Sequence, residues 1–258
     1  FTALMHAPKS GKNSPYALQA GLMVQGLDIP LDDPAFVGAL ARSRESLASL
    51  GLECLSIRTN FREISLTQWY HAFGSALAAC LHVLSPRFGT ALIPSSAAYH
   101  EPLNPTGSAP LTDHLLGSDA LRIVHDGAIY ARRDKLAALA AWPQGLANLR
   151  VCWQGQERDR NCCRCEKCVR NMINFRLLGM EIPNSFPEPL SPQLIRGLLF
   201  GKTEILIWGH LIAANTQGQL PADIVGAMRY ARRRMQWRQR RQGLKRKIKQ
   251  AWHQLHSR

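Results

Sequence analysis

The feature that most constrains this chain is a run of cysteines, NCCRCEKC, at residues 161–168. A fifth cysteine, Cys152, lies ten positions before the first of them. Cysteines this crowded, in a chain with no visible secretion signal, are typical of a metal site rather than of a disulfide framework. Bound to one ion, they would fix the path of the backbone around them.

The spacing Cys162-x2-Cys165-x2-Cys168 supplies three ligands, and Cys152 can supply the fourth from the preceding segment. Four thiolates with this spacing suit tetrahedral zinc. Cys163 is adjacent to Cys162 and cannot easily bind the same ion, so we leave it out of the ligand set. With four protein ligands and no open position, we expect a structural rather than a catalytic zinc ion.

Two other readings of these cysteines stay open. Three of them match the start of the ferredoxin run C-x2-C-x2-C-x3-C-P, but Met172 occupies the fourth cysteine's position and no proline follows it. A redox-active thiol pair is the second alternative, although a pair needs no further cysteines.

The charge of the chain is concentrated at its carboxyl end. Residues 229–258 contain twelve Lys and Arg and no acid, whereas the other 228 residues contain 20 bases and 18 acids. A basic segment of this kind attracts RNA or an anionic surface, but it is also typical of a solvated helix. No stretch is long and apolar enough to predict a transmembrane segment.

Hydrophobic runs predict an alternation of strands and helices, which is typical of an α/β fold with a parallel, doubly wound sheet. We expect five strands, at 17–26, 52–60, 90–96, 121–127 and 149–155, and helices at 36–50, 66–84, 132–142 and 166–178. Composition changes after Pro183, where a proline-rich linker leads to short apolar helices and then to the basic helix. The predicted domains are therefore 1–183 and a helical appendage, 184–258.

Polar residues follow each of the first four predicted strands. Asp28 follows the first, Thr59 and Asn60 the second, Ser95 and Ser96 the third, and His125 and Asp126 the fourth. In open parallel sheets, ligands bind beyond the carboxyl ends of the strands. The sequence therefore predicts one shared site there, although each of these residues is also compatible with a simple turn or cap.

The segment from LRVCWQG to NCCRCEKCVRNMINFRLLG resembles the carboxyl end of the PP-loop ATP pyrophosphatase superfamily, and more narrowly the branch that contains 7-cyano-7-deazaguanine synthase. GLDIPLDDP, LIPSSAAYHEPLNPTGSAPLTD, LRIVHDGA and ARRDKL are similar to segments of the same branch. The resemblance covers about residues 1–180. It implies a five-stranded parallel sheet and cleavage of ATP between its α and β phosphates, with Mg²⁺ as cofactor.

The resemblance also implies roles for individual residues. Asp113 is a further candidate for binding a metal or a substrate amine, or for starting a helix, and Lys135 is equally compatible with a solvated position. The implied catalytic residues are Ser95, His125, Asp126 and Arg132, and the implied nucleotide-binding residues are Asp28, Ser95, Ser96, His100 and Arg132.

Two departures from the family pattern stand out. The phosphate-binding SGGxDS loop is absent from this sequence, and family spacing would place it just before Phe1, so we expect a truncated chain. KSGKNS at 9–14 is no substitute, because Asn13 stands where a Walker A loop needs Ser or Thr. Cys163 stands where the family usually has Gly, which predicts backbone strain.

Three functions are compatible with these features. The first is a cytoplasmic ligase-like enzyme that uses ATP to adenylate a carboxylate or carbonyl oxygen of an unknown small-molecule acceptor. The second is a tRNA-modifying sulfur transferase that contacts RNA through residues 229–258. The third is a non-catalytic, zinc-stabilised binding module. A homodimer is an open alternative to a monomer in each case.

Overall fold

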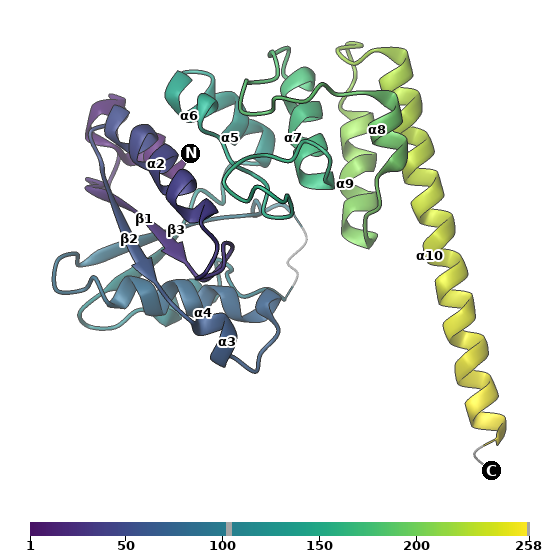
Figure 1. Cartoon of the computed structure of the whole chain (residues 1–258), viewed down its shortest axis with the longest axis horizontal. Coiled ribbons are helices and arrows are strands. Elements are labelled where there is room, and N and C mark those ends of the chain that lie inside the picture. Colours follow the sequence, from purple (N-terminus) through teal and green to yellow (C-terminus); the bar gives the residue numbers. More distant parts are fainter. Residues whose placement is uncertain (102–104, 257–258) are drawn as a thin grey trace. The chain divides into compact units, whose positions relative to one another are not determined.

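The computed structural model describes residues 1–101 and 105–256 (Figure 1). Three residues of the predicted nucleotide-facing loop, 102–104, and the last two of the basic tail lie outside the described residues. The chain divides into two compact units, residues 1–160 and 161–258. Among the described residues, no helix combines the length and the apolar character needed to cross a membrane.

The first unit alternates strands and helices, as predicted. Its strands are β1 (Ala20–Gln25), β2 (Glu53–Arg58), β3 (Thr90–Pro94) and β4 (Arg122–Asp126). Its helices are α1 (Thr2–His6), α2 (Ala35–Ser49), α3 (Phe61–Ile64), α4 (Trp69–His82), α5 (Arg132–Leu139) and α6 (Pro143–Ala147), with short 3₁₀ turns at Pro8–Ser10 (η1) and Asp113–Leu116 (η2).

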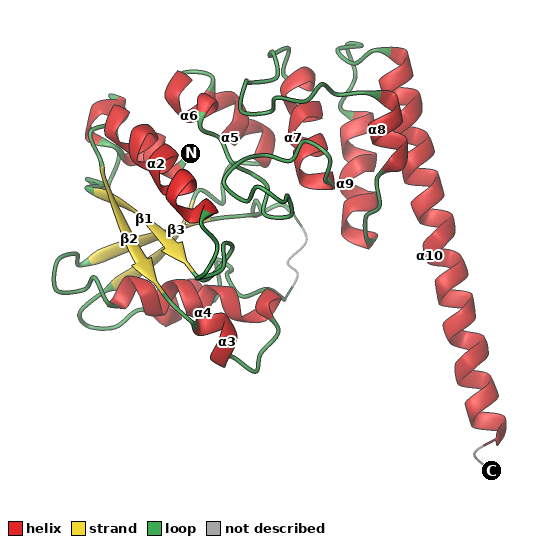
Figure 2. Ribbon diagram, in the orientation of Figure 1, coloured by secondary structure: helices red, strands yellow, loops and turns green. Residues whose placement is uncertain are grey.

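The four strands form two parallel pairs (Figure 2). β1 pairs with β2, from Ala20 opposite Glu53 to Gln25 opposite Arg58. β3 pairs with β4 in the same manner, from Thr90 opposite Arg122. The α/β class is therefore confirmed, but the described residues form two short sheets rather than one sheet of five strands.

The expected fifth strand at 149–155 is absent from the described secondary structure. The Arg150 guanidinium donates to the carbonyl oxygens of Cys152, at 2.9 Å, and Arg158, at 3.1 Å. The backbone bends at residues 153–157, so the segment is not extended along its length as a paired strand must be.

Each parallel pair is covered by a helix. Phe36 and Ala39 of α2 pack with Met23 of β1, while Ala78 of α4 packs with Ile93 of β3 and Ile123 of β4. The Asp33 carboxylate accepts a hydrogen bond from the Ala35 amide at 2.9 Å, as expected for a residue that starts a helix. Gly51, in the left-handed conformation at φ 75°, follows the end of α2, where a glycine commonly terminates a helix.

The second unit is helical and comprises α7 (Glu166–Leu177), α8 (Pro192–Gly197), α9 (Lys202–Ala213) and α10 (Ala222–His256). Its core joins Val169 and Ile173 of α7 to Ile195, Trp208 and Met228 of the later helices. Helix α7 therefore packs with the helices that follow it. The second unit begins at residue 161, before the predicted domain boundary after Pro183.

Helix α10 has two different halves. Ala227, Met228, Ala231 and Met235 are buried in the helical core, whereas Trp237 is 58% exposed. Figure 1 shows the second half of α10 extending past α8 and α9. Part of the predicted basic tail, residues 229–235, is therefore a structural element of the unit.

Two tryptophans of this unit test the difference between its buried core and the exposed second half of α10. Trp208 is 0% exposed, stacks on Phe200 at 5.0 Å and donates to Glu166 at 2.9 Å, whereas Trp237 is 58% exposed. We expect Trp208→Ala to lower the free energy of unfolding by about 3–5 kcal/mol, since it leaves a large cavity. Trp237→Ala should change it by about 0.5 kcal/mol or less. Urea unfolding followed by circular dichroism measures both, and equal losses would contradict the assigned core.

Candidate metal centre and polar cluster at the strand ends

The four predicted cysteine ligands come together. The sulfurs of Cys152, Cys162, Cys165 and Cys168 all lie within 4.8 Å of one another. A tetrahedral ion with metal–sulfur bonds of about 2.3 Å holds its sulfurs about 3.8 Å apart, and the Cys162 and Cys168 sulfurs lie 3.9 Å apart. The cluster can therefore hold one metal ion with four thiolate ligands.

The backbone around the cluster is shaped to present these sulfurs. The Cys165 amide faces the Cys162 sulfur at 3.4 Å, and the Gln154 amide faces the Cys152 sulfur at 3.4 Å. Such N–H groups stabilise negative charge on a coordinating sulfur. Cys163 lies in the left-handed region at φ 57°, as the sequence predicts for a position better suited to glycine.

The start of α7 is fixed by a side chain of its first turn. Glu166 accepts a hydrogen bond from the Trp208 indole at 2.9 Å and pairs with Arg170 at 3.4 Å. Cys165 immediately precedes this turn and Cys168 lies in it. Two of the four sulfurs are thus held by a helix that is anchored in its own core.

A second group of polar side chains surrounds Asp126, at the carboxyl end of β4. Its carboxylate accepts from the Thr2 hydroxyl at 2.5 Å and contacts His6 Nε2 at 2.9 Å. His6 Nδ1 lies 2.6 Å from the Ser14 hydroxyl, which donates to the Tyr16 carbonyl. His6 thus links the Asp126 carboxylate to the Ser14 hydroxyl.

Lys135 completes this polar cluster from α5. Its ammonium donates to the Ser95 hydroxyl at 2.6 Å and to the Ser95 carbonyl at 2.8 Å, and the Ser95 amide donates to the Asp126 carbonyl at 2.7 Å. Burial lowers the pKa of Lys135, and the nearby Arg132 charge lowers it further, while Asp126 and Glu101 oppose the shift.

His125 and Asp126 are adjacent in the chain, but their side chains contact different groups of residues. Successive side chains of a strand point to opposite faces, and His125 contacts Asp113 at 2.7 Å instead of joining the Asp126 cluster. Asp113 also accepts from Ser108 at 2.7 Å and from the Ala109 amide at 2.9 Å. Burial raises the pKa of Asp113, but these hydrogen bonds more than offset it and hold the pKa below its usual value.

The structure brings Ser95 and Asp126 together, places Arg132 three residues from Lys135 on α5, and places the other predicted residues elsewhere. Asp28 follows β1, in the other sheet, and is exposed. Ser96, His100 and Arg132 are exposed residues. Their predicted roles in binding a nucleotide stay predictions.

Two members of the cluster were missed by sequence reasoning, and a third, Lys135, was named there as equally compatible with a solvated position. Thr2 and His6 lie in an apolar stretch of seven residues that is too short to interpret from its pattern. Lys135 carried a usable signal, since its position three residues after Arg132 places it on the neighbouring part of the same helix face. Its burial, however, depends on the strand end that it contacts.

Comparisons of this chain with protein-family models, with curated proteins and with solved structures found no match.

The adjacent cysteines give a matched test of the metal centre. We expect the purified protein to contain about one metal ion per chain, and Cys162→Ser to lose most of it, because three thiolates and a hydroxyl bind a soft ion far less well. Cys163→Ser should retain the metal, since its sulfur is outside the cluster. Elemental analysis of both variants decides this, and equal metal contents would contradict the assigned ligands.

The electrostatics of Lys135 can be tested through its pKa. We expect the pKa of Lys135 to lie below the ordinary value of a lysine, so Lys135 should lose its proton at a lower pH than a solvated lysine does. Arg132→Ala should raise the pKa of Lys135 by removing a like charge, and Asp126→Asn should lower it further by removing an opposite one. Nuclear magnetic resonance titration of the lysine ε-carbons measures the pKa of Lys135 in the unsubstituted chain and in both variants. Shifts of the same sign in the two variants would contradict the cluster's charge arrangement.

Proposed function

We propose that this chain is an ATP-dependent, ligase-like enzyme of the PP-loop type, which adenylates a carboxylate or carbonyl oxygen and releases pyrophosphate. The observation that supports the proposal best is the cluster of Lys135, Ser95 and Asp126. It gathers a cation, a hydroxyl and a carboxylate at the carboxyl ends of β3 and β4, where parallel sheets bind ligands.

Each of these groups has a plausible task in such a reaction. Lys135 and Arg132 supply positive charge for phosphate oxygens, and the Asp126 carboxylate is a hard oxygen ligand of the kind Mg²⁺ prefers. Bound Mg²⁺ would neutralise charge that develops on the phosphates. His6 Nε2, 2.9 Å from Asp126, would orient that carboxylate.

We propose that the metal of the four-cysteine cluster is zinc and that its role is structural. All four ligands come from the protein, which leaves no position for a substrate. The close spacing of the sulfurs suits a single ion better than a cluster of several irons. One zinc per colourless chain is expected, and a brown, iron-containing protein would contradict this assignment.

Nucleotide binding tests the proposed activity. We expect the 258-residue chain to bind ATP with Mg²⁺, and Lys135→Met to weaken that binding about tenfold or more, since it removes a charge-assisted contact. Lys202→Met, at an exposed lysine of the helical unit, is the matched control and should leave the affinity unchanged. Equilibrium dialysis with labelled ATP measures these affinities.

The reaction products separate this class from other ATP-using enzymes. With candidate carboxylates present, we expect AMP and pyrophosphate, resolved by chromatography. ADP and phosphate, or no binding of ATP at millimolar concentration, would contradict the proposal and favour a non-catalytic, zinc-stabilised module.

The second half of α10 favours RNA modification as a second candidate function. Residues 239–258 hold seven Lys and Arg and no acid, and Trp237 stacks with Arg241 at 4.5 Å on the exposed part of the helix. Basic and aromatic groups together suit a nucleic-acid backbone and its bases.

A deletion that tests this role should remove residues 239–258 and leave the earlier part of α10 in place, because Ala231 and Met235 belong to the core. We expect this deletion to weaken tRNA binding and to flatten its dependence on salt. An unchanged affinity would exclude the helix as an RNA contact.

A further inference from the structure

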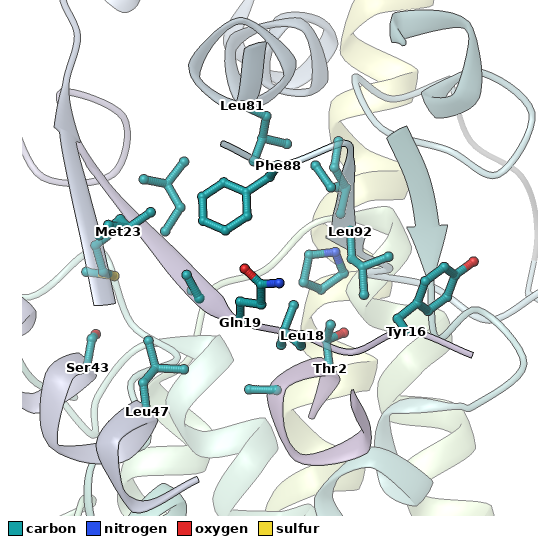
Figure 3. A pocket seen from close by; sticks show the side chains of 18 of the residues that line it. Thr2, Tyr16, Leu18, Gln19, Met23, Ser43, Leu47, Leu81, Phe88 and Leu92 are labelled. Atoms are coloured by element: carbon teal, nitrogen blue, oxygen red, sulfur yellow. The ribbon is translucent and has the colours of Figure 1, made fainter. Parts of the chain in front are cut away.

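A cavity and a helix face both leave large apolar side chains accessible in this chain. The cavity, of about 790 Å³, lies in the first unit, where the edges of β1, at residues 20–24, and of β3, Thr90–Pro94, line it. Figure 3 shows Met23, Leu92 and Leu47 around this space. The helix face belongs to α10 in the second unit. It lies on the outside of the helix, where an extended partner surface can contact it.

The exposed apolar residues of α10 recur at a regular interval. Tyr230, Trp237 and Leu244 follow one another seven residues apart in the helix. Trp252 comes eight residues after the last of them, and the four side chains are 53%, 58%, 60% and 55% exposed. Positions seven and eight residues apart lie on one face of an α-helix, because seven residues are almost two full turns. These four residues therefore form one line along the helix, the apolar row.

The apolar row is separate from the face by which α10 packs into the helical unit. That face extends to Met235, which is 5% exposed, whereas residues 240–246 are all exposed. Helices in proteins are stabilised mainly by the packing of an apolar face. Pairing along the helix cannot replace this packing, because residues 229–258 contain no acid to balance their cations. The second half of α10 therefore gains stability when a partner covers the row.

Positive charge accompanies the apolar row along its length. The Arg234 guanidinium lies 6.0 Å from the centre of the Tyr230 ring, and the Arg241 guanidinium lies 4.5 Å from that of Trp237. Each arginine is four residues after its ring, which places it on the next turn of the same face. Residues 237–252 contain seven Lys and Arg and no acid. The row is thus complementary to a surface that has both an apolar layer and negative charge.

The residue types of the row favour a lipid surface over a nucleic acid. Tryptophan and tyrosine are enriched where a bilayer meets water, and a basic amphipathic helix lies there with its apolar face against the acyl chains. A nucleic acid would instead use the rings as platforms for its bases. Arg241 already covers one face of Trp237, and Leu244 has no ring to offer. A bilayer with anionic headgroups uses the leucine, the rings and the cations together.

We propose that the second half of α10 docks on the surface of a bilayer that contains anionic phospholipids. Trp237, Leu244 and Trp252 enter the boundary of the acyl chains, and the flanking Lys and Arg side chains bind the phosphates. The helix lies in the plane of the surface and does not cross it. This attachment is independent of the proposed reaction. It gives the helix a different partner from RNA, and the experiment separates the two.

Vesicle flotation tests the proposal with the complete 258-residue chain. Vesicles of phosphatidylcholine alone are compared with vesicles of equal parts phosphatidylcholine and phosphatidylserine. We expect the chain to bind the anionic vesicles about tenfold or more tightly than the neutral ones, because each cation near the surface adds to the attraction. High salt should weaken this binding by screening the charges. Equal binding to both kinds of vesicle, or no binding at millimolar lipid, would overturn the proposal.

Two leucines of equal exposure form a matched pair of substitution sites. Leu244 of the row and Leu206 of α9 are both 60% exposed. We expect Leu244→Gln to weaken binding to the anionic vesicles about tenfold, because an apolar side chain is no longer removed from water. Leu206→Gln should leave the affinity unchanged. Both variants should keep the circular dichroism spectrum of the parent chain, since both positions are on the surface. Equal affinities of the two variants would contradict the docking face.

The same variant separates a bilayer from RNA. Leu244→Gln keeps every cation and every aromatic ring of the helix, so contacts to phosphates and stacking on bases survive it. We expect the substitution to weaken vesicle binding and to leave any affinity for tRNA unchanged, as measured by filter binding. A parent chain that binds tRNA but not the anionic vesicles would make RNA the partner of this helix and overturn the proposal.

Discussion

Parallel strand pairing is the constraint on which the first unit depends. Parallel strands cannot be joined by a tight turn, so each pair requires a long crossover connection. Between β1 and β2 that connection contains α2, which covers one face of the pair. The connection between β3 and β4 contains the 3₁₀ turn η2, and this pair is covered by α4, which precedes β3. The same directionality brings the ends of β3 and β4 to one edge, where Ser95 and Asp126 meet. The polar cluster is a consequence of the pairing.

The cysteine cluster is organised on a different principle. Its ligands come from seventeen consecutive residues, 152–168, and local turns are enough to bring the sulfurs within 4.8 Å of one another. The left-handed backbone at Cys163 and the anchored first turn of α7 shape that loop. If a metal ion is bound, it adds stability to a segment that has no strand pairing of its own.

The elements themselves were predictable because their signals are local. The predicted helix at 36–50 corresponds to α2, Ala35–Ser49, and the predicted strand at 17–26 contains β1, Ala20–Gln25. The segment 149–155 has an equally apolar pattern, yet its backbone bends from residue 153 and no strand forms. The sequence also could not predict whether the strands form one sheet or two. Pairing depends on which edges meet, and that is a property of the whole unit.

Sequence alone determined the metal ligands, the strand–helix alternation and the basic character of the last helix, because each depends on residue type and spacing. Tertiary structure decided which polar residues act together. It separated His125 from Asp126, since neighbouring side chains of a strand face opposite ways, and it joined Lys135 and His6 to the strand end. It also decided that residues 229–235 are core and that the edges of β1 and β3 face one cavity. Contacts between residues far apart in the chain carry no local signal.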